Sequence, residues 1–273
     1  MACRNAYRTR MLMEEEKEEK IVFSSPALTE PKVAKKVDRL LFGVDSSFKS
    51  DDHLQNNLDQ FEWVVRNKIY PNFYGRNLTG ENALTKKEID FIHRKGCQIL
   101  LYFSSAEGKE TETQGRVLAK QIGIKAIELG IKEGTAIFLE IGEKEPVKKK
   151  FLLAFAKEML VEGFTPGFKA NTDAKFEFDR EFSRGIQNDN EIFKKCLIWA
   201  VSPVIKEYDE MMTTHLIHPD NWEPYAPSGI SRDAIAVWQY GRNCHKIEND
   251  SRVETSFNLD LVRNEQVIID KMF

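Results

Sequence analysis

The chain has 273 residues, of which 41% are hydrophobic and 30% are charged, as in a globular protein with a substantial core. Its 40 basic and 43 acidic residues leave a formal net charge of -3, which gives no reason to expect a nucleic acid or an anionic membrane as a partner. No stretch approaches the roughly 18 to 20 consecutive apolar residues that are needed to span a bilayer.

The first residues form a segment of a different character from the rest. Residues 1–36 include a charged tract at 14–20, and we predict a charged arm that is partly disordered. They contain no apolar core of a secretory signal peptide, so a cytoplasmic location is the default expectation. Export by a non-classical or phage-type route stays open. Residues 37–273 are expected to form one domain.

Short apolar runs alternate with helical patterns along this domain. The predicted strands are residues 40–44, 69–74, 97–103, 136–141, 164–168, 196–201, 234–240 and 257–261. The predicted helices are residues 54–65, 85–95, 112–131, 146–161 and 173–184. Thr85 with Glu88 is a capping-box start, and Pro146 suits the first turn of a helix. Residues 202–232 are rich in proline and are predicted to be irregular.

The alternation of strands and helices is typical of βαβ units. It predicts a single closed α/β barrel of the (β/α)8, TIM-like type, which usually needs about 250 residues, with an irregular or incomplete last unit. An open doubly wound sheet is the alternative. It is weakened because no Gly-x-Gly-x-x-Gly motif and no phosphate loop follows a strand.

Acidic residues close two of the predicted strands. Asp45 ends the first and Glu140 ends the fourth, so their carboxylates are expected to face each other across the barrel mouth. Paired carboxylates of this kind carry out glycoside hydrolysis, one as the acid and the other as nucleophile or base. Taken singly, Asp45 and Glu140 are explained equally well by helix capping or by ion pairing. The aromatic residues expected nearby, as platforms for sugar rings, are Tyr102, Trp199, Trp238 and Tyr240.

Several short motifs resemble, in order, those of the bacterial glycoside hydrolase-like domain, a barrel family related to the family 25 glycoside hydrolases, or muramidases. The similar segments are residues 42–47 (FGVDSS), 73–78 (FYGRNL), 84–88 (LTKKE), 137–140 (IFLE), 199–200 (WA), 237–240 (VWQY) and 258–260 (NLD). The resemblance implies a barrel with an acidic mouth that acts on cell-wall glycan of the peptidoglycan type.

The resemblance also implies roles for individual residues. Glu140 would be the general acid, Asp45 and Asp260 would be stabilisers or nucleophile, and Glu143 would be a second candidate for the acid. Ligand contacts would come from Arg76, Tyr102, Trp199, Trp238, Gln239 and Tyr240. The muramidase motif Asp-x-Glu is incomplete, because its second carboxylate position is Phe138 in one register and Gly142 in the other.

The missing carboxylate leaves three hypotheses open. The first is a glycosidase of the lysozyme or muramidase type. The second is a carbohydrate- or cell-wall-binding barrel without turnover, and the third is a scaffold that binds another protein, for which residues 202–232 are the candidate surface. No cofactor motif is present. Four residues, His215, His218, Cys244 and His245, match no known zinc spacing, so we expect no metal site.

Overall fold

The computed structural model describes residues 40–54, 57–66, 69–188, 190–206, 219, 221–244, 247–248, 251–252, 255–263 and 268–273. All of them belong to one compact unit, Asp38–Phe273. The predicted charged arm at 1–36 lies outside the described residues. So do the middle of the irregular segment, at 207–218, and three of the four residues weighed as zinc ligands, His215, His218 and His245.

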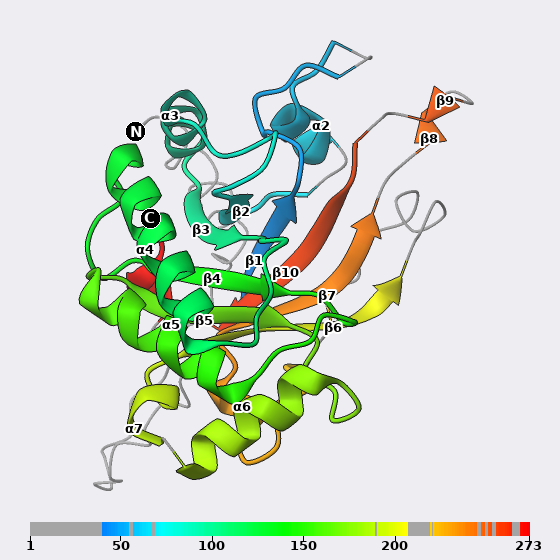
Figure 1. Cartoon of the computed structure of the whole chain (residues 1–273). Coiled ribbons are helices and arrows are strands. Elements are labelled where there is room, and N and C mark those ends of the chain that lie inside the picture. Colours follow the sequence, from blue (N-terminus) through cyan, green and yellow to red (C-terminus); the bar gives the residue numbers. More distant parts are fainter. Residues whose placement is uncertain are drawn as a thin grey trace, which may run out of the picture. The chain divides into compact units, whose positions relative to one another are not determined.

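Eight strands of the described chain close into a barrel in the order β1-β10-β7-β6-β5-β4-β3-β2 (Figure 1). The prediction of a single TIM-like barrel is therefore confirmed. The barrel strands are β1 (Leu40–Ser46), β2 (Phe73–Asn77), β3 (Gln98–Phe103), β4 (Ala136–Ile141), β5 (Thr165–Ala170), β6 (Leu197–Lys206), β7 (Val237–Cys244) and β10 (Phe257–Arg263). A separate small hairpin is formed by β8 (Ile247–Glu248) and β9 (Ser251–Arg252).

The last barrel strand departs from the expected parallel arrangement. β10 runs antiparallel to both of its neighbours, β1 and β7. The described residues between β7 and β10 hold only the β8–β9 hairpin and no helix, and an antiparallel neighbour needs no long crossover. In this direction Asn258 pairs with Asp45 near the rim, whereas Asp260 pairs with Gly43, deeper in the barrel.

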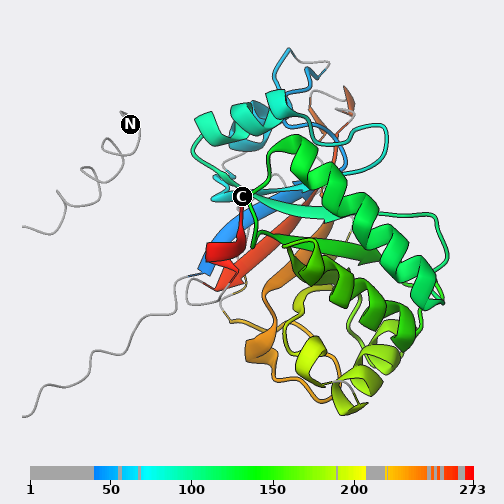
Figure 2. The same cartoon turned by 60° about the vertical axis from the view of Figure 1, so that its left-hand side comes forward.

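Helices cover the outside of the barrel after each of the first five strands. They are α2 (Gln60–Arg66), α3 (Lys86–Arg94), α4 (Glu112–Leu129), α5 (Lys149–Val161), α6 (Glu177–Asn188) and the short α7 (Asn190–Phe193). Figure 2 shows α4 and α5 packed side by side along the sheet.

Local chemistry explains where these elements begin and end. Thr85 caps α3, and Thr111 forms a full capping box at α4, while Gly130 ends α4 in the left-handed region at φ 80°. The predicted helix start at Pro146 is wrong, because α5 begins at Lys149. β2 begins later than predicted, after Pro71, which has no N–H to offer the sheet.

Apolar side chains fill two layers, one between the barrel and its helices and one inside the barrel. The inner layer includes Phe73, Leu100, Tyr102, Phe138, Trp199, Val237 and Val262, with Ile268 and Met272 from the last described residues. These last residues are held by two backbone hydrogen bonds between Ile99 and Phe273 (2.7 and 2.9 Å). The lower barrel is thus a packed core, and a ligand can enter only from the opposite end.

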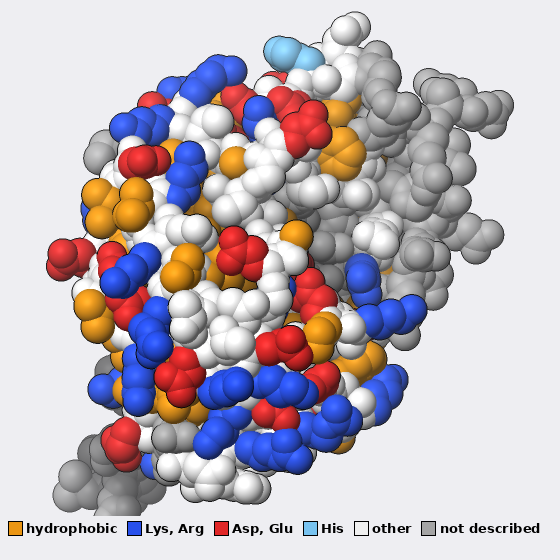
Figure 3. Space-filling model, viewed as in Figure 1, with side chains coloured by type: hydrophobic (Ala, Val, Ile, Leu, Met, Phe, Trp, Pro, Cys, Tyr) orange, Lys and Arg blue, Asp and Glu red, His pale blue; other side chains and the backbone are white. Residues whose placement is uncertain are grey.

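Charge on the outer surface is largely neutralised locally. Figure 3 shows lysine and arginine side chains gathered over α5 and α6, with acidic side chains between them. Lys148 pairs with Glu177, and Arg184 pairs with Glu181. No helix in the described part of the chain combines the length and the apolar character required to cross a bilayer.

Candidate functional site

A polar cavity of about 270 Å³ lies at the end of the barrel where the parallel strands finish. We call it the mouth. It brings together four residues singled out in the sequence: Asp45, Tyr102, Glu140 and Gln239. Its other lining residues are Ser46, Ser47, Asn77, Ser104, Lys169, Val201, Arg242, Asn243, Ser256, Phe257 and Asn258.

Lys169 occupies the centre of this arrangement. Its Nζ lies 2.9 Å from Asp45 Oδ1 and 3.4 Å from Glu140 Oε1, and the side chain is only 2% exposed. The rings of Tyr102 and Trp199 lie beneath it, with centroids 4.1 and 4.5 Å from Nζ. Burial alone would lower the pKa of Lys169, but the charges of Asp45 and Glu140 outweigh it and raise that pKa. Lys169 is therefore a fixed ammonium.

The sequence reasoning missed Lys169. The predicted fifth strand stopped at Phe168, whereas β5 continues to Ala170. In a strand alternate residues share a face, so the inward series through Gly167 continues to Lys169 and reaches the mouth. Extending the strand by two residues would have placed a lysine beside the predicted acids.

Asp45 is buried, and one of its two carboxylate oxygens is engaged. Its Oδ1 accepts hydrogen bonds from Lys169 Nζ (2.9 Å) and from Asn258 Nδ2 (3.0 Å). The Oδ2 atoms of Asp45 and Asp260 are both buried and have no hydrogen-bond partner among the described residues.

The surroundings of Asp260 favour the protonated form of its carboxyl. Burial, followed by the charge of Asp45, raises its pKa well above the ordinary 3.8, while Lys169 opposes the shift. Its Oδ1 accepts a hydrogen bond from Trp199 Nε1 at 2.9 Å. A nucleophile must reach the sugar, but Asp260 is 0% exposed because the antiparallel β10 places it deep in the barrel. Asp260 therefore lies beneath the mouth and does not line the cavity.

Glu140 is the acidic residue of the mouth that reaches solvent. Its side chain is 37% exposed, and its Oε2 accepts a hydrogen bond from Ser104 Oγ (2.5 Å). Phe138, the nearest residue before it on the same face of β4, is buried against the ring of Trp199 at a centroid distance of 5.5 Å. The other carboxylate position of the muramidase motif is thus part of the apolar core.

Three predicted ligand contacts lie on the outer face of the barrel, and we no longer assign them to the site. The buried Arg76 binds Glu88 of α3 (2.6 Å) and the carbonyl of Ser46. Trp238 and Tyr240 flank the inward Gln239 and so point outward, where both are buried. Trp199 does face inward, but it is 0% exposed and forms the floor beneath Lys169.

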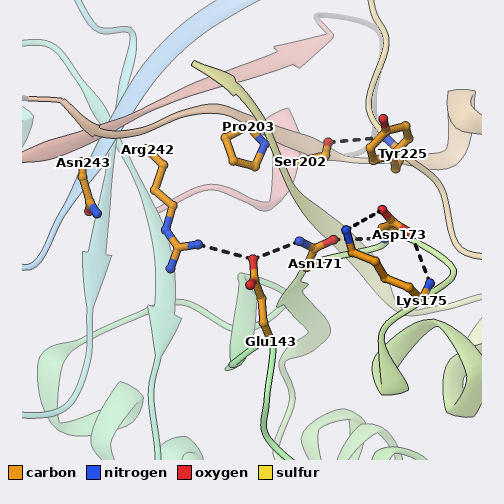
Figure 4. Close-up of a pocket in the computed structure, with 9 residues that line it drawn as sticks. All are labelled: Glu143, Asn171, Asp173, Lys175, Ser202, Pro203, Tyr225, Arg242 and Asn243. Carbon is orange, nitrogen blue, oxygen red and sulfur yellow. Dashed lines mark hydrogen bonds and ion pairs between the residues drawn. The ribbon is translucent and has the colours of Figure 1, made fainter. Parts of the chain in front are cut away.

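A second cavity of about 640 Å³ lies next to the mouth (Figure 4). We call it the side cavity. It is lined by Glu143, Asn171, Asp173, Lys175, Ser202, Pro203, Tyr225, Arg242 and Asn243. Glu143, predicted as a second candidate acid, lies here and accepts hydrogen bonds from Asn171 Nδ2 (3.0 Å) and Arg242 Nη1 (3.4 Å). It is therefore separate from Glu140.

No group of three or more His, Cys, Asp or Glu side chains within the described ranges could hold a metal ion. The donor set of the mouth does not suit a metal either, because Lys169 supplies the positive charge between the two carboxylates.

Comparison with known proteins supports the fold. No family model and no curated protein matches the chain. A *B. stearothermophilus* protein of solved structure matches at a TM-score of 0.68 and 23% identity, over 85% of this chain and 100% of that one. The two chains share one fold.

Cell-wall hydrolases also occur among the similar structures. The catalytic domain of endolysin ply40 from bacteriophage P40 of *Listeria monocytogenes* matches at a TM-score of 0.49 and 15% identity, over 85% of this chain and 97% of its own. A family GH25 lysozyme from *Aspergillus fumigatus* matches at 0.44 and 13%, over 85% and 98%. Similarity at this level assigns no activity.

Proposed function

We propose that the mouth binds an amino-sugar glycan of the peptidoglycan type and holds it without cleaving it. The observation that carries the proposal is the position of Lys169. Its ammonium lies between Asp45 and Glu140, the two groups that a glycosidase would need to keep in opposite protonation states.

The surroundings of Glu140 argue against a role as proton donor. A general acid has to hold a proton, yet Lys169 forms an ion pair with Glu140 at 3.4 Å and Ser104 donates a hydrogen bond to its Oε2. Asp45 has its Oδ1 occupied by two donors, and its Oδ2 is buried, so neither oxygen is open to a ligand. With Phe138 in the core, the mouth lacks the second reactive carboxylate of a cleaving pair.

The rest of the mouth suits the hydroxyl and acetamido groups of amino sugars. Its walls carry neutral amides and hydroxyls, which can donate and accept hydrogen bonds without a net charge. They include Asn77, Ser104, Gln239, Asn243 and Asn258. The similarity of the sequence motifs to those of the glycoside hydrolase-like domain supports the same ligand class.

Calorimetry with soluble β-linked amino-sugar oligosaccharides tests the proposal. The wild type should bind, and Glu140→Ala should weaken binding by about ten- to a hundredfold, because a charged hydrogen-bond acceptor at the ligand contributes about 1.5 to 3 kcal/mol. Glu128→Ala removes an exposed carboxylate on α4, away from the mouth, and should change nothing. Absence of binding by the wild type, or equal affinities for all three proteins, would contradict the proposal.

Hydrolysis is the second candidate function, and one observation favours it. Glu140 is a solvent-reachable carboxylate at the end of β4, the position of the general acid in the family that the sequence resembles. If the protein is a hydrolase, the wild type releases new reducing ends and Glu140→Gln does not.

A further inference from the structure

The mouth and the side cavity share one wall. Arg242 and Asn243 line both of them, and the side cavity, at about 640 Å³, is more than twice as large as the mouth, at about 270 Å³. A ligand that fills the mouth therefore has room to extend past Arg242 into the side cavity. Figure 4 shows Arg242 directed toward Glu143, which lies between Arg242 and Asn171.

The two cavities differ in their charged groups. In the mouth the charges of Asp45 and Lys169 are buried against each other, and most of the remaining lining is neutral. The side cavity presents four charged side chains, all of them at least one-third exposed: Glu143, Asp173, Lys175 and Arg242. Each sign of charge is represented twice.

The ion pairs in the side cavity are loose. Arg242 Nη1 lies 3.4 Å from Glu143 Oε1, and Lys175 Nζ lies 3.3 Å from Asp173 Oδ2. Exposed pairs of this kind contribute little, so a ligand that carries both signs can replace either partner at small cost. A neutral sugar has no group that would use these charges.

We propose that the side cavity binds a short peptide attached to the glycan, so that the barrel recognises a glycopeptide. The terminal carboxylate of the peptide pairs with Lys175 and Arg242, and the ammonium of a lysine-type side chain in the peptide pairs with Glu143 and Asp173. Tyr225, whose side chain is 57% exposed at this cavity, offers a flat apolar surface to the peptide. This inference rests on the glycan binding proposed above and adds the class of its substituent.

The test uses calorimetry on the full chain with two probes. One is a peptidoglycan-type disaccharide whose lactyl carboxyl is blocked as a methylamide, and the other is the same disaccharide carrying there a tripeptide that contains a lysine residue. The tripeptide probe should bind about tenfold more tightly, the gain of one or two exposed ion pairs. Lys175→Gln should reduce that gain about threefold or more, by the same reasoning, and blocking the tripeptide carboxylate as an amide should do the same.

A matched control and the possible outcomes distinguish a failure of this inference from a failure of the proposed glycan binding. Lys157→Gln removes an exposed lysine of α5 that lines neither cavity, and it should leave both affinities unchanged. If the disaccharide binds and the tripeptide adds nothing, or if Lys175→Gln weakens both probes equally, this inference is wrong and glycan binding stands. If neither probe binds, both proposals are wrong.

Discussion

Lys169 places a buried ammonium between Asp45 and Glu140, and this one residue changes what the mouth can do. A buried carboxylate without partners costs several kcal/mol, so Asp45 requires the donors that surround it. Lys169 and Asn258 both donate to its Oδ1. This occupied oxygen supports the proposal that the mouth holds a sugar without cleaving it.

The proton on Asp260 predicts a dependence of stability on pH. Because its pKa is raised in the folded state, that state binds more proton than the unfolded state at pH values between the ordinary 3.8 and the raised value. The free energy of unfolding contributed by Asp260 is therefore fully present below 3.8 and falls as the pH rises through the raised pKa. In Asp260→Asn the amide has nearly the same shape, keeps an oxygen for Trp199 Nε1 and does not titrate.

Urea unfolding of the wild type and Asp260→Asn at a series of pH values checks this. The variant should gain stability relative to the wild type as the pH rises above 3.8. Asp260→Ala leaves Trp199 Nε1 without its acceptor and should be less stable than Asp260→Asn throughout. Parallel curves for the wild type and Asp260→Asn would show that no proton is held at this position.

The secondary-structure elements show which parts of the fold the sequence could predict. The bounds of β4 agree with the predicted residues 136–141, because a continuous apolar run specifies a strand buried on both faces. The direction of β10 could not be predicted. An apolar run has the same pattern whichever way the strand runs, and the segment that connects it to the preceding strand decides its direction. The same holds for the predicted site. In the structure Asp45 and Glu140 line the mouth, whereas Asp260, Trp238 and Tyr240 do not.

Strand β1 depends on a glycine for its packing against β2. A Cβ added at Gly43 would lie 2.3 Å from the ring of Phe73, which fills the barrel beneath the mouth. We expect Gly43→Ala to lower the free energy of unfolding by about 1 to 3 kcal/mol, the usual cost of overpacking. Chemical denaturation measures it. The double variant Gly43→Ala with Phe73→Leu should recover part of the loss, and failure to recover would place the cause elsewhere.

The barrel as a whole is closed by apolar packing at one end and open at the other. Ile268 and Met272 lie within the inner core, while the two cavities share the opposite rim. This division leaves one face for ligands, as in other barrels of this class. On that face the acidic groups are held in ion pairs and the neutral groups are free to make hydrogen bonds, which favours retention of a ligand over reaction with it.

The most direct test of this account is the fate of a bound glycan. The wild-type protein is incubated with soluble peptidoglycan-type strands, and both complex formation and strand length are followed by mass spectrometry. We expect the strands to be bound and to keep their full length over many hours. Shortened strands that no longer form when Glu140 is replaced by glutamine would contradict the account.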